Sequence, residues 1–574
     1  MTILHTLKSL SLDEMFLADV GITCVVLCLL YLAYRLKWIR STKPQAYMQA
    51  GRAAAFVCII TAALLPLAVR MGLFPWRPLP QPHIHDEFGH LLVADTLASG
   101  RLTNPPHALW RHLDTIYVIQ RPTYSSIYPI GQGALLAAGK LATGSPWAGV
   151  LIATALMTAA VCWAFIDLLP LPWIAIGGLV AGFTYGLRWV DSYWGGAFCA
   201  FGGALVFGAL LRLQRSVSIW MALLLGIGWS ITWLIRPFES IFLLMFSWGC
   251  LAVLVASRRY AWKRWVLPLS LVVAVEGCAG TVTAAQNRAV SGSFITFPYH
   301  LLQADAGVPQ TLLWQSPVPP PKFRFPEMER MYAWQLQEKK LPVASRLSSV
   351  VHTVWDFFVT PWYSIPFACA LFAYKDRRVL LSWLLAAFAT AAGLLYPFFF
   401  PHYIAAYTCI FVFLIVRGCM VVWNWRIRET TVGPWLVSFL MIGGLLKIVV
   451  TMVPIGISAP SSAVFSTPRS QIASRLSAAG GRHVVFVRYG PKHNFHDEWV
   501  YNTADIDHSP IVWCRWMGLN EDEAVMRYYP DRKFWTVEIG GAQRSVNLSP
   551  YLDRNNRIGS YSQTSETLNP NPAL

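Results

Sequence analysis

Residues 218–257 read SIWMALLLGIGWSITWLIRPFESIFLLMFSWGCLAVLVAS, and the only charged side chains in this stretch are Arg236 and Glu239. Two apolar runs lie near 218–235 and 240–257. Each is close to the length of about 20 residues that an α-helix needs to cross a bilayer. Arg236-Pro237-Phe238-Glu239 lies in the turn between them. The stretch therefore predicts two transmembrane helices joined at one face of a membrane.

The same pattern extends outward along the chain. Of its 574 residues, 55% are hydrophobic and only 13% are charged, with a mean hydropathy of +0.45. A soluble domain cannot bury that much apolar surface, whereas a bilayer can, and the 26 Trp suit interfacial belts. We expect an all-α polytopic membrane protein with about twelve spans, near 17–35, 53–73, 146–169, 172–188, 196–213, 218–235, 240–257, 265–285, 357–374, 379–397, 403–422 and 434–456.

Short clusters of cations predict the orientation of these spans, because cytoplasmic loops carry an excess of Lys and Arg. Asp13, Glu14 and Asp19 precede the first apolar run, the reverse of a cleaved signal peptide, so the N-terminus is expected outside. The net charge of +17 then reflects topology, and no nucleic-acid partner is predicted. The clusters expected inside are Lys37/Arg40/Lys43, Arg212/Arg215, Arg258/Arg259/Lys263/Arg264, Lys375/Arg377/Arg378 and Arg426/Arg428.

The sequence divides into three regions: an extra span and loop over 1–52, a membrane domain over 53–459, and an extracytoplasmic domain over 460–574. Outer loops are predicted at 74–145 and 286–356. The second holds a helix-like stretch from Glu327 to Lys340. The last region is expected to be a small α/β domain with a loose tail after Ala542, with helices at 472–479 and 521–529 and strands at 483–488, 511–516 and 534–538.

Several chemical classes find no support in the sequence. There is no Walker loop, no GxGxxG at a strand–helix turn, no GxSxG and no HExxH. His493, His496, Asp497 and Glu498 form only a weak metal pattern, so we predict no metal site and no required cofactor, although an acid pair could hold a divalent metal. The 11 Cys, nearly all in or beside apolar runs, form no disulfide framework. No internal repeat is visible, which counts mildly against transporters built from repeated halves.

The strongest candidate for chemistry is His85-Asp86-Glu87-Phe88, directly after the second predicted span. Adjacent carboxylates near a membrane are costly to keep ionised unless they are used. Asp86 could take a proton from a hydroxyl nucleophile, and His90, four residues on, would share its helix face. The alternative is a solvated helix start, whose acids simply favour the N-terminal dipole.

Further candidates mix aromatic and polar groups at the expected outer surface. Such a mixture suits a sugar site, although an interfacial belt has the same composition. An outer Arg at membrane depth suggests an anionic partner such as a lipid phosphate, although Arg236 could simply pair with Glu239, and His402 could be a satisfied interfacial histidine. The candidate binding residues are His90, Arg121, Tyr124, Tyr128, Asp191, Tyr193, Trp194, Arg236, Glu239, His402 and Tyr403.

These motifs together resemble the GT-C glycosyltransferases, and more narrowly the bacterial members akin to the aminoarabinose and protein O-mannosyl transferases. The resemblance lies in Asp86-Glu87-Phe88 with the run from Ala94 to Pro105, in Pro122-Thr123-Tyr124, in Ser192 to Gly196 and in Arg236-Pro237. It implies a sugar carried on a polyprenyl phosphate, with Asp86 as the acid at the acceptor and Glu87 as a supporting acid. The extra N-terminal span departs from the simplest family layout.

The resulting expectation is inverting sugar transfer at the outer face of a bacterial inner membrane. Arg236 and His402 are the candidates for holding the donor phosphate, and the acceptor is a lipid, a glycan or a protein. A flippase for lipid-linked sugars is the alternative, which should place polar groups mid-membrane, where Glu276 and Lys447 are the main exceptions. A scaffold acting through residues 460–574 is a third possibility.

Overall fold

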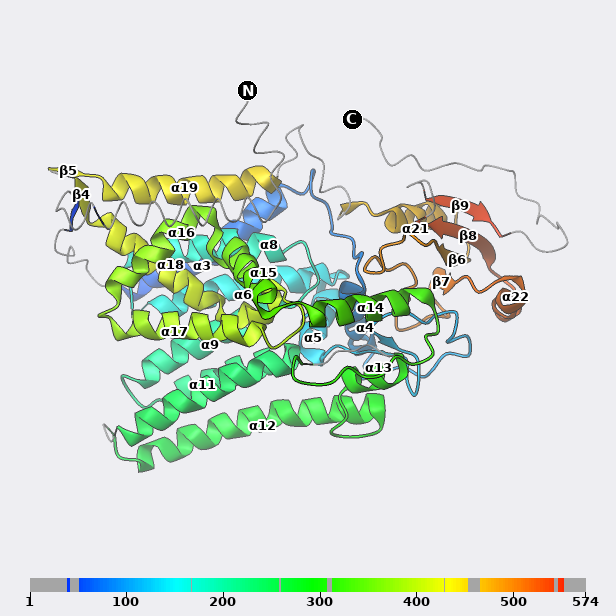
Figure 1. The fold of residues 1–574 in the computed structure, drawn as a ribbon, viewed down its shortest axis with the longest axis horizontal. Helices are drawn as coiled ribbons and strands as arrows, with labels where there is room; N and C mark the ends of the chain where they lie inside the picture. The colour runs from blue at the N-terminus through cyan, green and yellow to red at the C-terminus, as the bar shows by residue number, and fades with distance from the viewer. Residues whose placement is uncertain are drawn as a thin grey trace, which may run out of the picture.

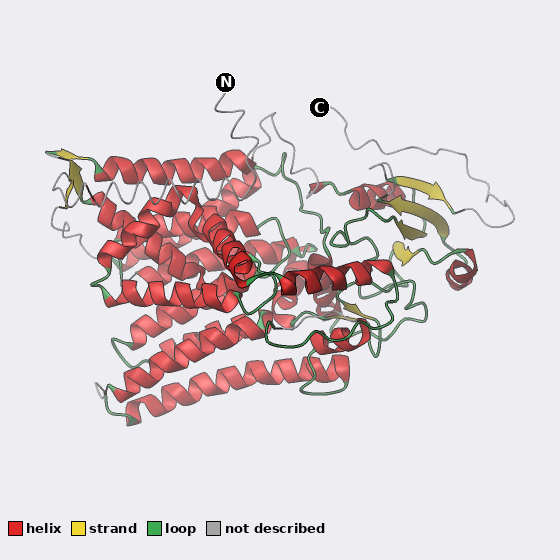
Figure 2. Ribbon diagram, in the orientation of Figure 1, coloured by secondary structure: helices red, strands yellow, loops and turns green. Residues whose placement is uncertain are grey.

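The computed structural model describes residues 32, 39–41, 51–166, 168–257, 260–306, 312–427, 429–452, 465–540 and 546–551. The first predicted span, 17–35, lies outside these residues except for Leu32. Figure 1 shows long helices packed side by side, with the C-terminal strands at one end of the bundle, and Figure 2 shows that helices dominate the fold.

The apolar runs form helices because a helix satisfies its own backbone hydrogen bonds, which a bilayer requires. Six described helices are long and apolar enough to cross a membrane: Ala53–Gly72, Trp147–Phe165, Gly196–Leu213, Pro237–Ala256, Lys263–Ser291 and Pro401–Trp423. Ile219–Ile235 and Gly433–Ile448 are shorter apolar helices. The protein is therefore mostly helical, and its long apolar helices indicate a membrane protein. The count of twelve spans stays a prediction.

The helices of the bundle follow the predicted spans closely in position. They are α3 (Arg52–Gly72), α6 (Trp147–Phe165), α7 (Leu171–Leu179), α8 (Leu187–Trp189), α9 (Gly196–Leu213), α10 (Ile219–Ile235), α11 (Pro237–Ala256), α12 (Lys263–Ser291), α16 (Thr360–Cys369), α17 (Arg377–Gly393), α18 (Thr408–Trp423) and α19 (Gly433–Met452). The core sits around α18, most of whose residues are buried against α9, α16 and α17.

Three predicted spans are less regular than their hydropathy implies. The 172–188 span contains a π-helical segment, η1 (Val180–Gly186), between α7 and α8. The 357–374 span consists of a π-helical segment η2 (Trp355–Val359), then α16 and a 3-10 segment η3 (Ala370–Ala373). The 403–422 span begins with a 3-10 segment, η4 (Pro401–Tyr407). Apolar composition sets where a span lies but not its internal hydrogen-bond pattern.

The outer loops are more structured than predicted. The 74–145 segment contains α4 (His85–Ala98), α5 (Ile130–Thr143), β2 (Val118–Ile119) and β3 (Ser125–Ser126), which pair antiparallel. α12 extends six residues past the predicted end of its span, into the segment that was assigned to the second outer loop. That segment also holds α13 (Pro298–Ala306), α14 (Pro326–Lys340), as predicted, and α15 (Val343–Val354).

The C-terminal segment forms a four-stranded sheet of order β7-β6-β8-β9. Its elements lie where the sequence predicts them: α21 (Pro468–Ala478), β6 (His483–Tyr489), β7 (Ile511–Arg515), α22 (Leu519–Tyr528) and β8 (Lys533–Ile539). Strands β6, β7 and β8 are parallel. The tail after Ala542 is predicted to be loose. Instead, part of it forms β9 (Asn547–Pro550), which pairs antiparallel with β8. This pairing uses backbone groups, so the polar side chains of the tail do not predict it.

Predicted inside clusters come together at one end of the bundle. β1 (Ile39–Ser41) pairs antiparallel with β4 (Trp425–Ile427), so Arg40 lies opposite Arg426, and β5 (Thr430–Thr431) completes the small sheet. The hydroxyl of Tyr260 donates to the carbonyl of Arg215, which joins two further predicted inside loops. This grouping agrees with the alternation on which the predicted orientation depends.

Candidate active site

The candidate site begins at the first turn of α4. Asp86 and Glu87 lie in that turn, where carboxylates favour the helix dipole, and Gly100 adopts a positive φ of 72° just beyond the helix end. The chain before α4 is fixed by the C-terminal segment, because Ile84 forms an antiparallel bridge with Asp497. The amide of Glu498 also donates to the carbonyl of His83 at 2.8 Å.

Asp86 is held by two neighbours while its side chain stays 29% exposed. His85 Nδ1 lies 2.8 Å from Asp86 Oδ2, and the Tyr128 hydroxyl donates to Asp86 Oδ1. Burial alone would raise the pKa of Asp86, but the hydrogen bonds from His85 and Tyr128 and the nearby charges of His85 and His402 lower it below its ordinary value. Each carboxylate oxygen keeps a free lone pair for a further donor.

Asp86 faces a cavity of about 400 Å³ that gathers residues from distant parts of the chain. Trp233, Arg236 and Glu239 come from the α10–α11 junction, Tyr299 and His300 from α13, and His402 and Tyr403 from η4. The other lining residues that matter below are Tyr117, Tyr128, Phe238, Phe297, Tyr396 and Phe398. The cavity thus joins two carboxylates, Asp86 and Glu239, with the guanidinium of Arg236 and a predominantly aromatic wall.

Arg236 points into this cavity with its charge only partly compensated. Its Nη1 lies 3.3 Å from Glu239 Oε1, and its guanidinium stacks 4.7 Å from the centre of the Tyr403 ring. The Arg236 and Glu239 side chains are each 17% exposed. The predicted pairing of these two residues is present, and it leaves the guanidinium beside the open volume of the cavity.

Two histidines lie close to this group. His402 is buried, with its ring 4.6 Å from the ring of Trp194. His90 stacks on Tyr128 at 4.3 Å and does not line the cavity. Burial and the charge of Arg236 lower the pKa of His90 to about 3, so His90 is neutral and supports Tyr128 rather than an anion.

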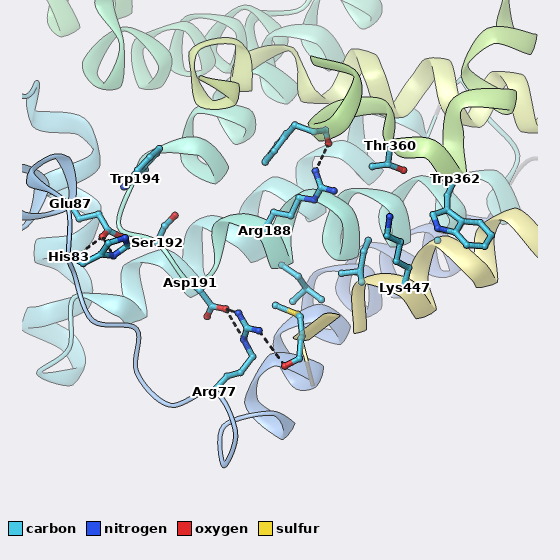
Figure 3. Close-up of a pocket in the computed structure, with 15 residues that line it drawn as sticks. Arg77, His83, Glu87, Arg188, Asp191, Ser192, Trp194, Thr360, Trp362 and Lys447 are labelled. Atoms are coloured by element: carbon cyan, nitrogen blue, oxygen red, sulfur yellow. Dashed lines mark hydrogen bonds and ion pairs between the residues drawn. The ribbon is translucent and has the colours of Figure 1, made fainter. Parts of the chain in front are cut away.

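Glu87, unlike Asp86, lines a second cavity of about 570 Å³ (Figure 3). Glu87 is buried and accepts hydrogen bonds from the amides of Tyr193 and His83, each at 3.2 Å. Asp191 lines the same cavity and is bound by Arg70 at 2.7 Å and Arg77 at 3.0 Å. Glu87 and Asp191 therefore have local partners that fix the start of α4 and the loop after α8.

The structure brings together only part of the predicted set. Asp86, Tyr128, Arg236, Glu239, His402 and Tyr403 line the first cavity, whereas Glu87, Asp191 and Trp194 line the second.

Besides His90, three predicted binding residues line neither cavity. Arg121 is exposed and stacks on Trp110 at 4.5 Å. The buried hydroxyl of Tyr124 donates to the carbonyl of Asn502 at 2.7 Å, and that of Tyr193 to the carbonyl of Pro80 at 3.0 Å. Their binding roles stay predictions, and a loop's composition does not show which way each side chain turns.

Some cavity residues were missed by sequence reasoning. Tyr299 and His300 lie on a short helix within the second outer loop, for which no motif was visible. Tyr396 lies six residues before the predicted His402, and His85, which contacts Asp86 without lining the cavity, was quoted only as a neighbour of Asp86. Aromatic density at the outer ends of spans was the available signal. Among the described residues, no group of three or more His, Cys, Asp or Glu is placed to hold a metal ion.

Comparisons with known proteins were made at the level of sequence and of structure. No protein-family model matches the chain, and no curated protein sequence matches it either. Archaeal oligosaccharyltransferase AglB from Archaeoglobus fulgidus, in complex with an inhibitory peptide and a dolichol-phosphate, is similar in structure at a TM-score of 0.45 and 12% identity, covering 84% of this chain and 69% of AglB.

A second similar structure is ArnT from Cupriavidus metallidurans bound to undecaprenyl phosphate, at a TM-score of 0.33 and 12% identity, covering 85% of this chain and 93% of ArnT. At such scores the likeness assigns no function, which has to come from the residues of the site.

Proposed function

We propose that this protein transfers a sugar from a polyprenyl-phosphate donor to an acceptor hydroxyl in the cavity of Asp86, Arg236 and His402, at the outer face of the inner membrane. The donor's apolar tail lies against the membrane helices. Its phosphate meets Arg236, with His402 beside it, and its sugar lies among the aromatic side chains of the wall. Aromatic rings stack on the C–H faces of sugars, and Glu239 supplies an acceptor for a sugar hydroxyl.

The reaction is a single displacement. The acceptor oxygen forms a bond to the anomeric carbon, the bond from that carbon to the phosphate oxygen breaks, and its electron pair stays on the phosphate. The acceptor proton passes to Asp86 as the new bond forms. Charge therefore develops on the leaving phosphate beside Arg236, a fixed cation in a partly dry site, which is the usual electrostatic contribution to catalysis. One displacement inverts the anomeric configuration.

One observation carries this proposal: a carboxylate from α4, an arginine from the α10–α11 turn and a histidine from η4 meet at one cavity. These residues are separated by more than a hundred positions along the chain. Arg236 lies between two apolar helices, which supports a cavity at the membrane surface, within reach of a lipid-borne anion. A proton acceptor next to that cation is the pair of groups that glycosyl transfer from a lipid phosphate requires.

The test is transfer by the full-length protein in proteoliposomes that contain lipid-linked sugars extracted from the source membranes. Asp86→Asn should lower the acceptor-dependent release of free polyprenyl phosphate by about 100-fold or more, the lower range of general-base contributions. Asp505→Asn is the matched control, because Asp505 is an exposed acid paired with His508. Undiminished release by Asp86→Asn, at equal membrane expression, would remove Asp86 from the mechanism.

The same proteoliposomes distinguish transfer from transport. Movement of intact lipid-linked sugar between leaflets, without release of polyprenyl phosphate, would favour a flippase. Glu276, the predicted candidate for a proton relay, lies 3.2 Å from the indole nitrogen of Trp248, so it has a structural partner. Mass spectrometry of envelope glycans with and without the protein would then identify the sugar and the acceptor.

A further inference from the structure

The second cavity, between α8, η2, α16 and α19, has a charge pattern that the proposed transfer does not use. Arg77, Arg188 and Lys447 line it, together with the carboxylates of Asp191 and Glu87 (Figure 3). Arg70 and Arg77 share Asp191. Glu87 is buried against backbone amides. The carboxylates of Asp191 and Glu87 therefore have partners other than Arg188 and Lys447.

Arg188 and Lys447 are the two cations of this cavity for which the described residues form no close ion pair, although the charge of Asp356 also acts on Arg188. Arg188 donates to the backbone carbonyls of Asp356 and Phe357 at 2.9 and 3.2 Å, and within the described part of the chain neither cation has an ion pair with a carboxylate. Both side chains are exposed, and Figure 3 shows them on the same side of the hollow as Thr360. Two positive charges without carboxylate partners on apolar helices indicate an anionic ligand.

Thr360 adds a second, independent observation. Its φ of 55° is a conformation that β-branched residues rarely adopt, and such strained residues cluster at ligand sites. Its buried backbone places it in the cavity wall next to Trp362. The Trp194 indole nitrogen, also in this wall, is buried without a hydrogen-bond partner. Cations without a close ion pair and polar groups thus face the same volume.

The position of the cavity indicates that its ligand is a lipid. Lys447 lies five residues before Met452 at the end of α19, which corresponds to about 8 Å of helix, near the depth of the headgroup–acyl boundary. Phe439, Ile442 and Leu446 on the same helix are exposed apolar side chains, as expected of a surface that faces acyl chains. Leu187, Phe357, Trp362 and Ile448 give the cavity an apolar wall for the start of a tail.

We propose that this cavity is a second lipid site, which binds the phosphate headgroup of an anionic membrane lipid through Arg188 and Lys447. It is separate from the cavity of Asp86, because the Trp194 and His402 rings, 4.6 Å apart, stand between them. The binding does not depend on sugar transfer in the first cavity. The phosphate of the bound lipid supplies the negatively charged partner that Arg188 and Lys447 do not have among the described carboxylates.

The experiment is native mass spectrometry of the delipidated full-length protein titrated with phosphatidic acid, with phosphatidylcholine of the same chains as comparator. Wild type should bind one phosphatidic acid about tenfold more tightly than phosphatidylcholine, and Arg188→Ala/Lys447→Ala should lose this preference. Lys263→Ala/Arg264→Ala is the matched control, since it removes the same two charges from exposed positions at the start of α12. Arg236→Ala should leave the site intact.

Further variants and an unfolding measurement distinguish loss of lipid binding from loss of folding. Arg188→Lys/Lys447→Arg should retain the preference, and the thermal unfolding of the lipid-free variants should match wild type, which excludes a folding defect. Equal preference in wild type and Arg188→Ala/Lys447→Ala would overturn the proposal. Loss of the bound lipid in Arg236→Ala alone would place it in the Asp86 cavity and would also overturn it. Full displacement by millimolar inorganic phosphate would show a site for a soluble anion instead.

Discussion

Adjacent residues can serve different cavities, as Asp86 and Glu87 do. Successive side chains on a helix diverge by about 100°, so two neighbouring carboxylates cannot face one ligand equally. Asp86 stays 29% exposed and meets the cavity that contains Arg236, whereas Glu87 is 4% exposed at its side chain and holds backbone amides. The sequence could identify the acid pair. It could not show which acid was free, because that depends on the loop from Asp191 to Gly195 folding over Glu87.

The hydrogen bond from Tyr128 predicts a measurable pH effect. Because this bond and His85 lower the pKa of Asp86, Asp86 stays ionised as the pH falls through the ordinary range of a carboxyl group, and it is protonated only below it. Tyr128→Phe removes the bond, so the pKa of Asp86 should rise. The acid limb of kcat/KM against pH should then move to higher pH.

Tyr124→Phe is the control for this experiment, because the Tyr124 hydroxyl donates to Asn502 and lies outside the cavity. Its acid limb should coincide with that of wild type. An unmoved limb in Tyr128→Phe would mean that another group controls the acid side of the reaction.

Arg236 and Glu239 provide a second prediction at the residue scale. A hydrogen bond to a charged group is worth about 1.5–3 kcal/mol, so Arg236→Ala should raise the KM for the lipid-linked donor roughly 10- to 150-fold. Glu239→Gln removes the carboxylate that competes with the phosphate for Arg236 and should not raise that KM comparably. Initial rates at varied donor concentration measure both. Equal increases in the two variants would assign the ion pair a structural role only.

At the scale of elements, helix packing is the feature that is hardest to predict from the sequence. Hydropathy located the apolar helices within the described residues, because burial in lipid and burial in protein both require apolar side chains. It could not show that α5, with the apolar sequence IGQGALLAAGKLAT, packs on α4 and α6 instead of lying in an open loop. It also could not find the cavity wall from Tyr299 and Tyr396, because their approach depends on how α13 packs against the segment between α17 and η4.

Close packing of α9 against η4 predicts that a small change will disturb the site. A Cβ at Gly203 would lie 1.7 Å from the carbonyl oxygen of Ala406, so the two segments would have to separate. η4 carries His402 and Tyr403, and overpacking typically costs about 1–3 kcal/mol. Gly203→Ala should lower both the thermal unfolding temperature in detergent and the transfer rate.

Gly277→Ala is the matched control in α12, since a Cβ there meets nothing within 4 Å. Alanine also favours a helix over glycine by about 1 kcal/mol, so this variant should unfold at the same or a slightly higher temperature. If Gly203→Ala behaved like Gly277→Ala, the α9–η4 contact would not position the site.

At the scale of the whole molecule, the C-terminal segment packs against the candidate site and helps to position it. Phe486 and Val484 of β6 share a buried cluster with Phe88 and Leu92 of α4, and the ring of His496 lies 5.5 Å from that of His85. Deleting residues 460–574 would therefore disturb Asp86 as well. Such a deletion cannot distinguish a scaffold from an enzyme, and Asp86→Asn is the sharper test.

A buried ion pair across this interface gives the last prediction. Arg515 Nη1 lies 2.6 Å from Glu327 Oε2, both residues are buried, and the Arg515 guanidinium stacks 3.7 Å from the Phe325 ring. Removing Arg515 leaves the buried Glu327 with Arg330 as its remaining partner, so the cost stays below the about 3–5 kcal/mol of a fully unpaired buried charge. Arg515→Ala should therefore loosen the contact between β7 and α14, which faster hydrogen exchange in both segments would reveal. Arg515→Met/Glu327→Gln should restore most of the protection, because no uncompensated carboxylate remains. If the double variant exchanged as fast as Arg515→Ala, the packing of Arg515 on Phe325, rather than its charge, would hold the C-terminal sheet against the outer loops.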